Sequence, residues 1–75
     1  MINLTTAQCK ASGFSHAEVS EISPDEFTII FNRGEDLLFG VLDQQGKTKT
    51  YKSLSTAAAF AKSCGVHTLQ VKFIL

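Results

Sequence analysis

Two cysteines and two histidines are the residues best suited to bind a metal or to act as nucleophiles. Cys64 and His67 are separated by two residues, and Cys9 and His16 by six. Thiolates and imidazoles are the ligands of structural zinc, but such sites usually draw closer pairs of ligands from turns. Both cysteines fall in segments that we expect to be helical. We therefore interpret the cysteines as small buried thiols and the histidines as surface residues, and expect no metal or other cofactor.

Cys64 and His67 are also the candidate pair for nucleophilic catalysis. Such a pair needs a thiolate stabilised by its surroundings, contact between the two side chains, and donors for an oxyanion. Cys64 is expected at the C-terminus of a helix, where the helix dipole opposes a negative charge. We therefore predict that the protein is not an enzyme, and keep a Cys64–His67 enzyme as the third hypothesis for its function.

The charges are divided unevenly along the chain, although they sum to zero. Residues 1–43 hold two basic and seven acidic residues, a formal charge of −5, whereas residues 44–75 hold five lysines and no acid, a charge of +5. Asymmetry of this kind occurs in proteins that bind nucleic acids. The simpler interpretation, which we favour, is that opposite charges on neighbouring strands neutralise each other across a sheet.

Three of these lysines and the single tyrosine form a candidate site of contact with nucleic acid or a protein partner: Lys47, Lys49, Tyr51 and Lys52. Residues 47–51 alternate lysine or tyrosine with threonine, which predicts a strand with one basic face. A basic stripe with an aromatic ring can bind single-stranded nucleic acid. Alternatively, lysines protect an exposed edge strand from pairing with other chains.

The most clearly marked element is a helix over Leu54–Cys64. Ser53 can cap its first turn, and Gly65 stands where helices commonly end in the left-handed conformation. Apolar side chains recur on one face at helical spacing: Leu54, Ala57, Ala58, Ala61 and Cys64. This pattern predicts that the helix packs across one face of a sheet, which its small alanines can approach closely.

The segment Ala17–Ile22 has two interpretations. Residues 15–18 match a capping box, which would begin a helix. The Pro24-Asp25 turn and the β-rich run Phe27–Asn32 that follow it favour a hairpin instead. We favour the hairpin, and the choice between strand and helix stays open.

One helix and three strands complete the predicted fold: Thr5–Ser12, Leu37–Asp43, Lys47–Lys52 and Val66–Leu75. The segment 37–43 is apolar on both faces, which is typical of a central strand covered on both sides. The order is therefore α-β-β-β-β-α-β. We predict an α+β fold with an antiparallel sheet of four or five strands and the second helix, about Leu54–Cys64, on one sheet face.

Length and composition indicate a single small domain, residues 1–75. The hydrophobic fraction of 44% and six phenylalanines argue against disorder. Two cysteines are too few for a disulfide framework, no basic and apolar leader follows Met1, and no apolar run approaches the roughly 20 residues of a membrane span. We expect a cytoplasmic protein with reduced thiols and no membrane contact.

Residues 17–71 resemble a set of short uncharacterised bacterial proteins, a domain of unknown function. In those proteins a strand meander ends in a D-x-x-G-K/R turn and is followed by a helix beginning with Ser-Leu and by a closing strand. The matching positions are Asp43 and Gly46 in the turn, and Ser53 and Leu54 at the start of the helix. Each has a structural role, so the resemblance implies a fold and no established activity.

Our leading hypothesis for function is a non-enzymatic interaction module that forms a homodimer or binds a protein partner. It rests on the doubly apolar segment 37–43, because two short helices are too few to cover both faces of its sheet. An apolar sheet face or an edge strand would make the contact. The alternative is a nucleic-acid-binding accessory protein that uses Lys47, Lys49 and Lys52.

Overall fold

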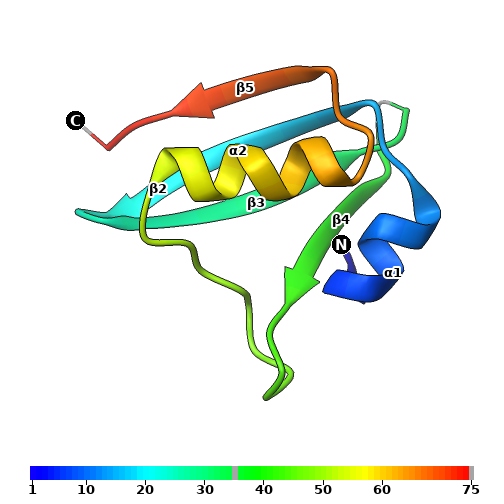
Figure 1. The fold of residues 1–75 in the computed structure, drawn as a ribbon, viewed down its shortest axis with the longest axis horizontal. Coiled ribbons are helices and arrows are strands. Elements are labelled where there is room, and N and C mark those ends of the chain that lie inside the picture. Colours follow the sequence, from blue (N-terminus) through cyan, green and yellow to red (C-terminus); the bar gives the residue numbers. More distant parts are fainter. Residues whose placement is uncertain (35, 75) are drawn as a thin grey trace.

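The computed structural model describes residues 1–34 and 36–74. In this part of the chain, five strands and two helices follow one another: β1 (Ile2–Thr5), α1 (Thr6–Ser12), β2 (His16–Ser23), β3 (Glu26–Asn32), β4 (Leu38–Leu42), α2 (Leu54–Ser63) and β5 (Thr68–Lys72). Figure 1 shows the helices and strands. The α+β class is confirmed. Leu75, predicted as part of the last strand, lies outside the described residues. None of the helices described is long and apolar enough to cross a membrane.

The strands form one mixed sheet in the order β1-β4-β3-β2-β5. β3 pairs antiparallel with β2 and with β4, but β1 pairs parallel with β4, and β5 pairs parallel with β2. The prediction of an antiparallel sheet is therefore wrong at both edges. α2 carries the chain from the end of β4 back to the side of the sheet where β4 begins, so β5 runs parallel to β4. Since β2 and β4 are both antiparallel to β3, β5 is parallel to β2 as well.

Strand β1 was missing from the predicted order. It covers Ile2–Thr5, and each of its residues pairs with one residue of β4. Thr5 also caps α1: its Oγ1 accepts from the N–H of Gln8 at 3.2 Å, and its own N–H donates to the Gln8 side chain at 2.9 Å. The helix predicted over Thr5–Ser12 is confirmed as Thr6–Ser12, with Thr5 as its N-cap. Four residues are too few to show strand periodicity, and only pairing with a distant strand makes this segment extended.

The hairpin interpretation of the Ala17–Ile22 segment is confirmed. β2 and β3 pair in register from His16 opposite Asn32 to Glu21 opposite Phe27, and the turn between the strands holds Asp25 with a φ of 62°. Ala17 and Val19 point to the same side as Ile29 and Phe31, and all four are buried. This apolar row on the hairpin outweighs the local capping-box signal, because a helix there would remove β2 from the sheet and leave β5 without the strand that it pairs with.

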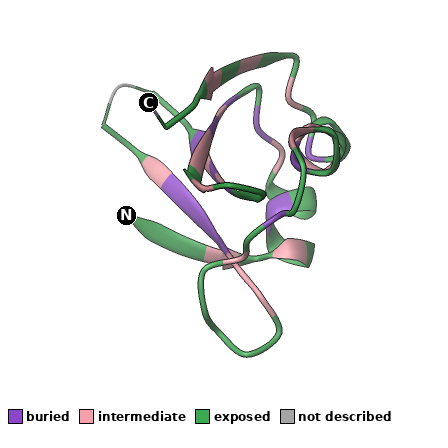
Figure 2. Cartoon of the chain, turned by 90° about the vertical axis from the view of Figure 1, so that its left-hand side faces the viewer, coloured by how far each residue is buried: buried purple, intermediate pink, exposed green. Residues whose placement is uncertain are grey.

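Both helices lie on the same side of the sheet, as Figures 1 and 2 show together. α2 begins and ends within one residue of the predicted bounds, and its cap is confirmed by the Thr56 N–H, which donates to Ser53 Oγ at 3.1 Å. Ala57 and Ala61 are buried against the sheet. The helix is therefore held by an apolar face that lies close to the strands.

The predicted edge strand Lys47–Lys52 does not form. β3 and β4 pair through only three residue pairs and then diverge, and the returning chain enters the gap between them. There the Lys49 N–H donates to the Val41 carbonyl at 2.8 Å, and Tyr51 and Phe27 exchange two backbone hydrogen bonds of 2.8 Å each. These contacts make isolated bridges and no ladder. The segment is an internal wedge because the open backbone groups of two diverging strands need partners.

The turn before this wedge explains two of the positions in the bacterial resemblance. The Asp43 carboxylate accepts from the N–H groups of Gln45 and Lys47, both at 2.9 Å. Gly46 has a φ of 79°, a conformation that side chains disfavour. Asp43 and Gly46 therefore shape the turn, as expected from the sequence.

Gly65 supplies a test of how closely the end of α2 packs against Phe14. Its φ is 98°, and a Cβ there would meet the Phe14 carbonyl oxygen at 3.2 Å. We expect Gly65→Ala to lower the free energy of unfolding by about 2 kcal/mol or more, through conformational strain and this contact. Gly46→Ala is the matched control, because its φ is also positive but no atom lies within 4 Å of the added methyl. Equal losses in urea unfolding of the two variants would contradict the close packing of Gly65 against Phe14.

Candidate functional site

The residues of the predicted basic stripe do not share a face. Lys47 and Lys52 are exposed, and Lys49 is half-buried with its ammonium 5.7 Å from the centre of the Tyr51 ring. Tyr51 itself is only 5% exposed and stacks on Phe60 of α2, with ring centres 5.8 Å apart. The tyrosine is therefore a core residue with no face free for a base, and the lysines remain as isolated surface charges.

The hydroxyl of Tyr51 is buried and has no hydrogen-bond partner among the described residues. Burial raises the pKa of this phenol, and the neighbouring Cys9 and Cys64 raise it further. The alternation of residues 47–51 had placed Tyr51 beside the lysines, on the basic face. Only the insertion of this segment between β3 and β4 brings the ring into the core.

Cys9 of α1 and Cys64 at the end of α2 are both buried, as expected, with exposed fractions of 0% and 2%. Burial and the proximity of Cys64 raise the pKa of Cys9 to about 11. Burial also raises the pKa of Cys64, against smaller opposing effects of Ser63 and Lys10. His67 is exposed, so the candidate catalytic pair combines a core thiol with a surface imidazole. Both thiols have surroundings that oppose the thiolate a nucleophile requires.

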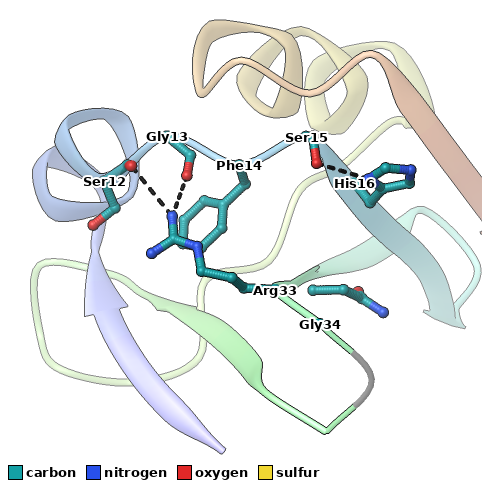
Figure 3. Close-up of a pocket in the computed structure, with 8 residues that line it drawn as sticks. Ser12, Gly13, Phe14, Ser15, His16, Arg33 and Gly34 are labelled. Atoms are coloured by element: carbon teal, nitrogen blue, oxygen red, sulfur yellow. Dashed lines mark hydrogen bonds between the residues drawn. The ribbon is translucent and has the colours of Figure 1, made fainter.

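The hollow where α1 meets the end of β3 contains Arg33, a residue that the sequence analysis did not single out (Figure 3). The Arg33 guanidinium lies 4.6 Å from the centre of the Phe14 ring. It donates to the carbonyl oxygen of Ser12 at 3.2 Å and to that of Gly13. Its positive charge thus complements the C-terminal end of α1. The one arginine of the chain is engaged in holding α1 to β3.

The face of the sheet opposite the helices, which we call the uncovered face, receives no second layer from the described residues. It is partly apolar. Its apolar strip consists of Ile30, Leu38 and Leu42, which are all half-buried. These side chains alternate along their strands with buried residues that point to the helices. Beside the strip, the place of a side chain at Gly40 is filled by Asn3 and Met1.

The other half of the uncovered face is polar. On β2, the Ser20 hydroxyl donates to the carboxylate of Glu18 at 3.3 Å. The ammonium of Lys72 on β5 lies 3.2 Å from the same carboxylate. This cross-strand pair is an instance of the charge neutralisation that we favoured from the sequence. The uncovered face is therefore less apolar than the doubly apolar strand had implied.

Large exposed apolar side chains also occur outside this strip, near the two ends of the chain, within β2 and directly before β4: Met1, Ile2, Ile22, Leu37, Phe73 and Ile74. The parallel register places Ile2 beside β4. The backbone N–H of Ile74 donates to the Glu21 carboxylate at 3.2 Å, which holds the end of the chain beside β2. Exposed apolar side chains thus occur at both edges of the sheet, Ile2 on β1 and Phe73 and Ile74 directly after β5.

In comparisons with known proteins, the chain matches no protein-family model, no curated protein and no solved structure. No cluster of three or more histidine, cysteine, aspartate or glutamate side chains able to hold a metal occurs within residues 1–34 and 36–74.

The buried thiols predict how stability depends on pH. In the unfolded chain Cys9 loses its proton near its ordinary pKa of 9.0, whereas in the folded protein its pKa is about 11. Deprotonation between these pH values therefore favours unfolding, and we expect the contribution of Cys9 to the free energy of unfolding to be constant below pH 9 and to fall toward pH 11. Denaturant titrations monitored by circular dichroism measure this slope.

Cys9→Ala is the control for this pH dependence. Its overall stability falls because the exchange leaves a cavity, but its loss of stability between pH 9 and 11 should be shallower. A slope as steep as that of the unmodified protein would show that Cys9 is not the group responsible.

Proposed function

We propose that the protein is a non-enzymatic interaction module that associates with a second copy through its uncovered face. The observation that carries this proposal is that both helices lie on one side of the sheet, while the opposite side holds the apolar strip Ile30, Leu38 and Leu42. Burying this strip against its own symmetry mate is the simplest way to remove it from water. A cytoplasmic location accords with the free thiols of Cys9 and Cys64.

The charges on the uncovered face support association between two copies. Glu18 and Lys72 already neutralise each other on one chain, so two such faces can meet without like charges opposing across the interface. A protein partner of another kind would use the same strip. Alternatively, such a partner would add a strand to β1 or β5, because each has only one neighbour in the sheet.

Ile30→Lys tests the uncovered face. Ile30 lies directly opposite Glu18 on β2, so a lysine there can pair with this carboxylate while the monomer stays folded. In a face-to-face dimer the same charge would be taken out of water, and we expect the dissociation constant to rise by about tenfold or more. Sedimentation velocity over a range of concentrations measures this change.

Ala59→Lys is the matched control, because it adds the same charge at an exposed position of α2. It should associate like the unmodified protein, and circular dichroism should show both variants folded. A protein that sediments as a monomer at all concentrations, or an Ile30→Lys variant that associates unchanged, would overturn association through the uncovered face.

Nucleic-acid binding is the second candidate, and the charge distribution favours it. α1, α2 and the segment 44–53 carry five lysines and no acid, whereas the acids lie on the hairpin and in the flanking turns. The burial of Tyr51 removes the aromatic ring that could stack on a base. What remains are separate lysine charges, which would bind phosphates without reading sequence.

The triple variant Lys47→Ala, Lys49→Ala, Lys52→Ala tests this candidate. The triple variant should bind a fluorescent single-stranded oligonucleotide at low salt about tenfold or more weakly than the unmodified protein does. Binding by the unmodified protein should fall steeply as salt is raised. Lys72→Ala is the control, since its ammonium is paired with Glu18 and should contribute little. If the unmodified protein does not bind at low salt, the nucleic-acid candidate is eliminated.

A further inference from the structure

The two histidines of the chain, 51 positions apart in sequence, lie side by side at one end of the sheet. His16 begins β2, and His67 directly precedes β5, the parallel neighbour of β2. The backbone N–H groups of His67 and Thr68 both donate to the Ser15 carbonyl, at 3.1 and 3.3 Å, and fix the two chain segments together. The imidazole rings are exposed, with centres 5.2 Å apart and planes at 69°.

We propose that His16 and His67 together bind one divalent transition-metal ion, of the class of Zn²⁺, Ni²⁺ or Cu²⁺. Two imidazoles that bind one ion through bonds of about 2 Å at a tetrahedral angle have ring centres roughly 5 Å apart. The observed separation of 5.2 Å already has this value. Both rings are exposed, so small rotations about their side-chain bonds can direct the two nitrogens at one ion.

The neighbours of the two rings support this role. The Nδ1 of His16 lies 2.7 Å from the Ser15 hydroxyl, and the Nδ1 of His67 lies 3.0 Å from the Thr68 hydroxyl. When each Nδ1–H donates to its hydroxyl, each Nε2 keeps a lone pair for the metal. Histidines that bind metals characteristically have such a partner on the other ring nitrogen, because it fixes the tautomer.

The surroundings determine which ions fit and how strongly. Two imidazoles favour borderline ions over Mg²⁺ and Ca²⁺, which prefer oxygen ligands. His16 borders a shallow hollow on the uncovered face that also contains Glu18 and Asn32. Lys62 borders the hollow beside His67, and its charge opposes a cation. Water completes the coordination, and affinity should follow the order Cu²⁺ above Ni²⁺ and Zn²⁺.

The test is titration of the tag-free protein with Zn²⁺ and Ni²⁺ at neutral pH, followed by isothermal calorimetry and by the imidazole signals in NMR spectra. We expect one ion per chain. Zn²⁺ should shift the signals of both rings, and paramagnetic Ni²⁺ should broaden them. His16→Gln and His67→Gln should each weaken binding by about tenfold or more. Lowering the pH should weaken binding because protons compete for the imidazoles.

Lys62→Gln is the control, because it removes a nearby charge but no ligand and should leave binding equal or tighter. The proposal is overturned if only one ring responds, or if the double variant His16→Gln, His67→Gln binds the ions as tightly as the unmodified protein. Measurement at protein concentrations where sedimentation shows a monomer keeps this result separate from association through the uncovered face.

Discussion

The ring of Phe14 stacks on Phe31 with centres 4.6 Å apart and lies 5.0 Å from the ring of Phe39, while the Phe14 N–H donates to the Cys64 carbonyl at 2.8 Å. One residue in the short connection after α1 thus joins β3, β4 and the end of α2. Arg33 covers the outer side of this ring and donates to the last carbonyls of α1. The position of both helices depends on this contact, because neither is long enough to be stable without packing.

A core built in this way is thin and one-sided. Its large side chains come from one face of the strands, and α2 approaches that face with alanines, so most of the apolar volume lies in the aromatic rings. The opposite face receives no layer from the described residues and holds only half-buried apolar side chains. In the described residues both helices lie on one side of the five-stranded sheet (Figure 2), and the apolar side chains on its other side are the physical basis for the proposed association.

The same arrangement separates the chemical groups of the molecule. The thiols and the phenol lie inside, where burial favours their neutral forms. The imidazoles lie outside at the end of the sheet, and the lysines belong to other elements than the acids of the hairpin, although Lys72 on β5 pairs with Glu18. The groups inside the core are therefore held in their neutral forms, and the imidazoles and most of the lysines are at the surface.

Features fixed by neighbours in sequence could be predicted from the residues alone. The Thr5 and Ser53 caps, the turn at Pro24-Asp25 and the period of α2 each depend on contacts within a few positions. The residue types at these positions indicate those contacts directly. Both helices and the β2–β3 hairpin could therefore be predicted. The burial of Cys64 followed from the same periodicity.

The tertiary structure alone decided the features that join distant segments. β1 is extended because β4 pairs with it, and the edges of the sheet are parallel because helices carry the chain back across it. Tyr51 is buried because diverging strands admit its segment, although its alternation with lysines predicted an exposed face. The approach of His16 and His67 depends on β5 choosing β2 as its neighbour. Local periodicity determines which way a side chain can point, but strand order determines what it meets.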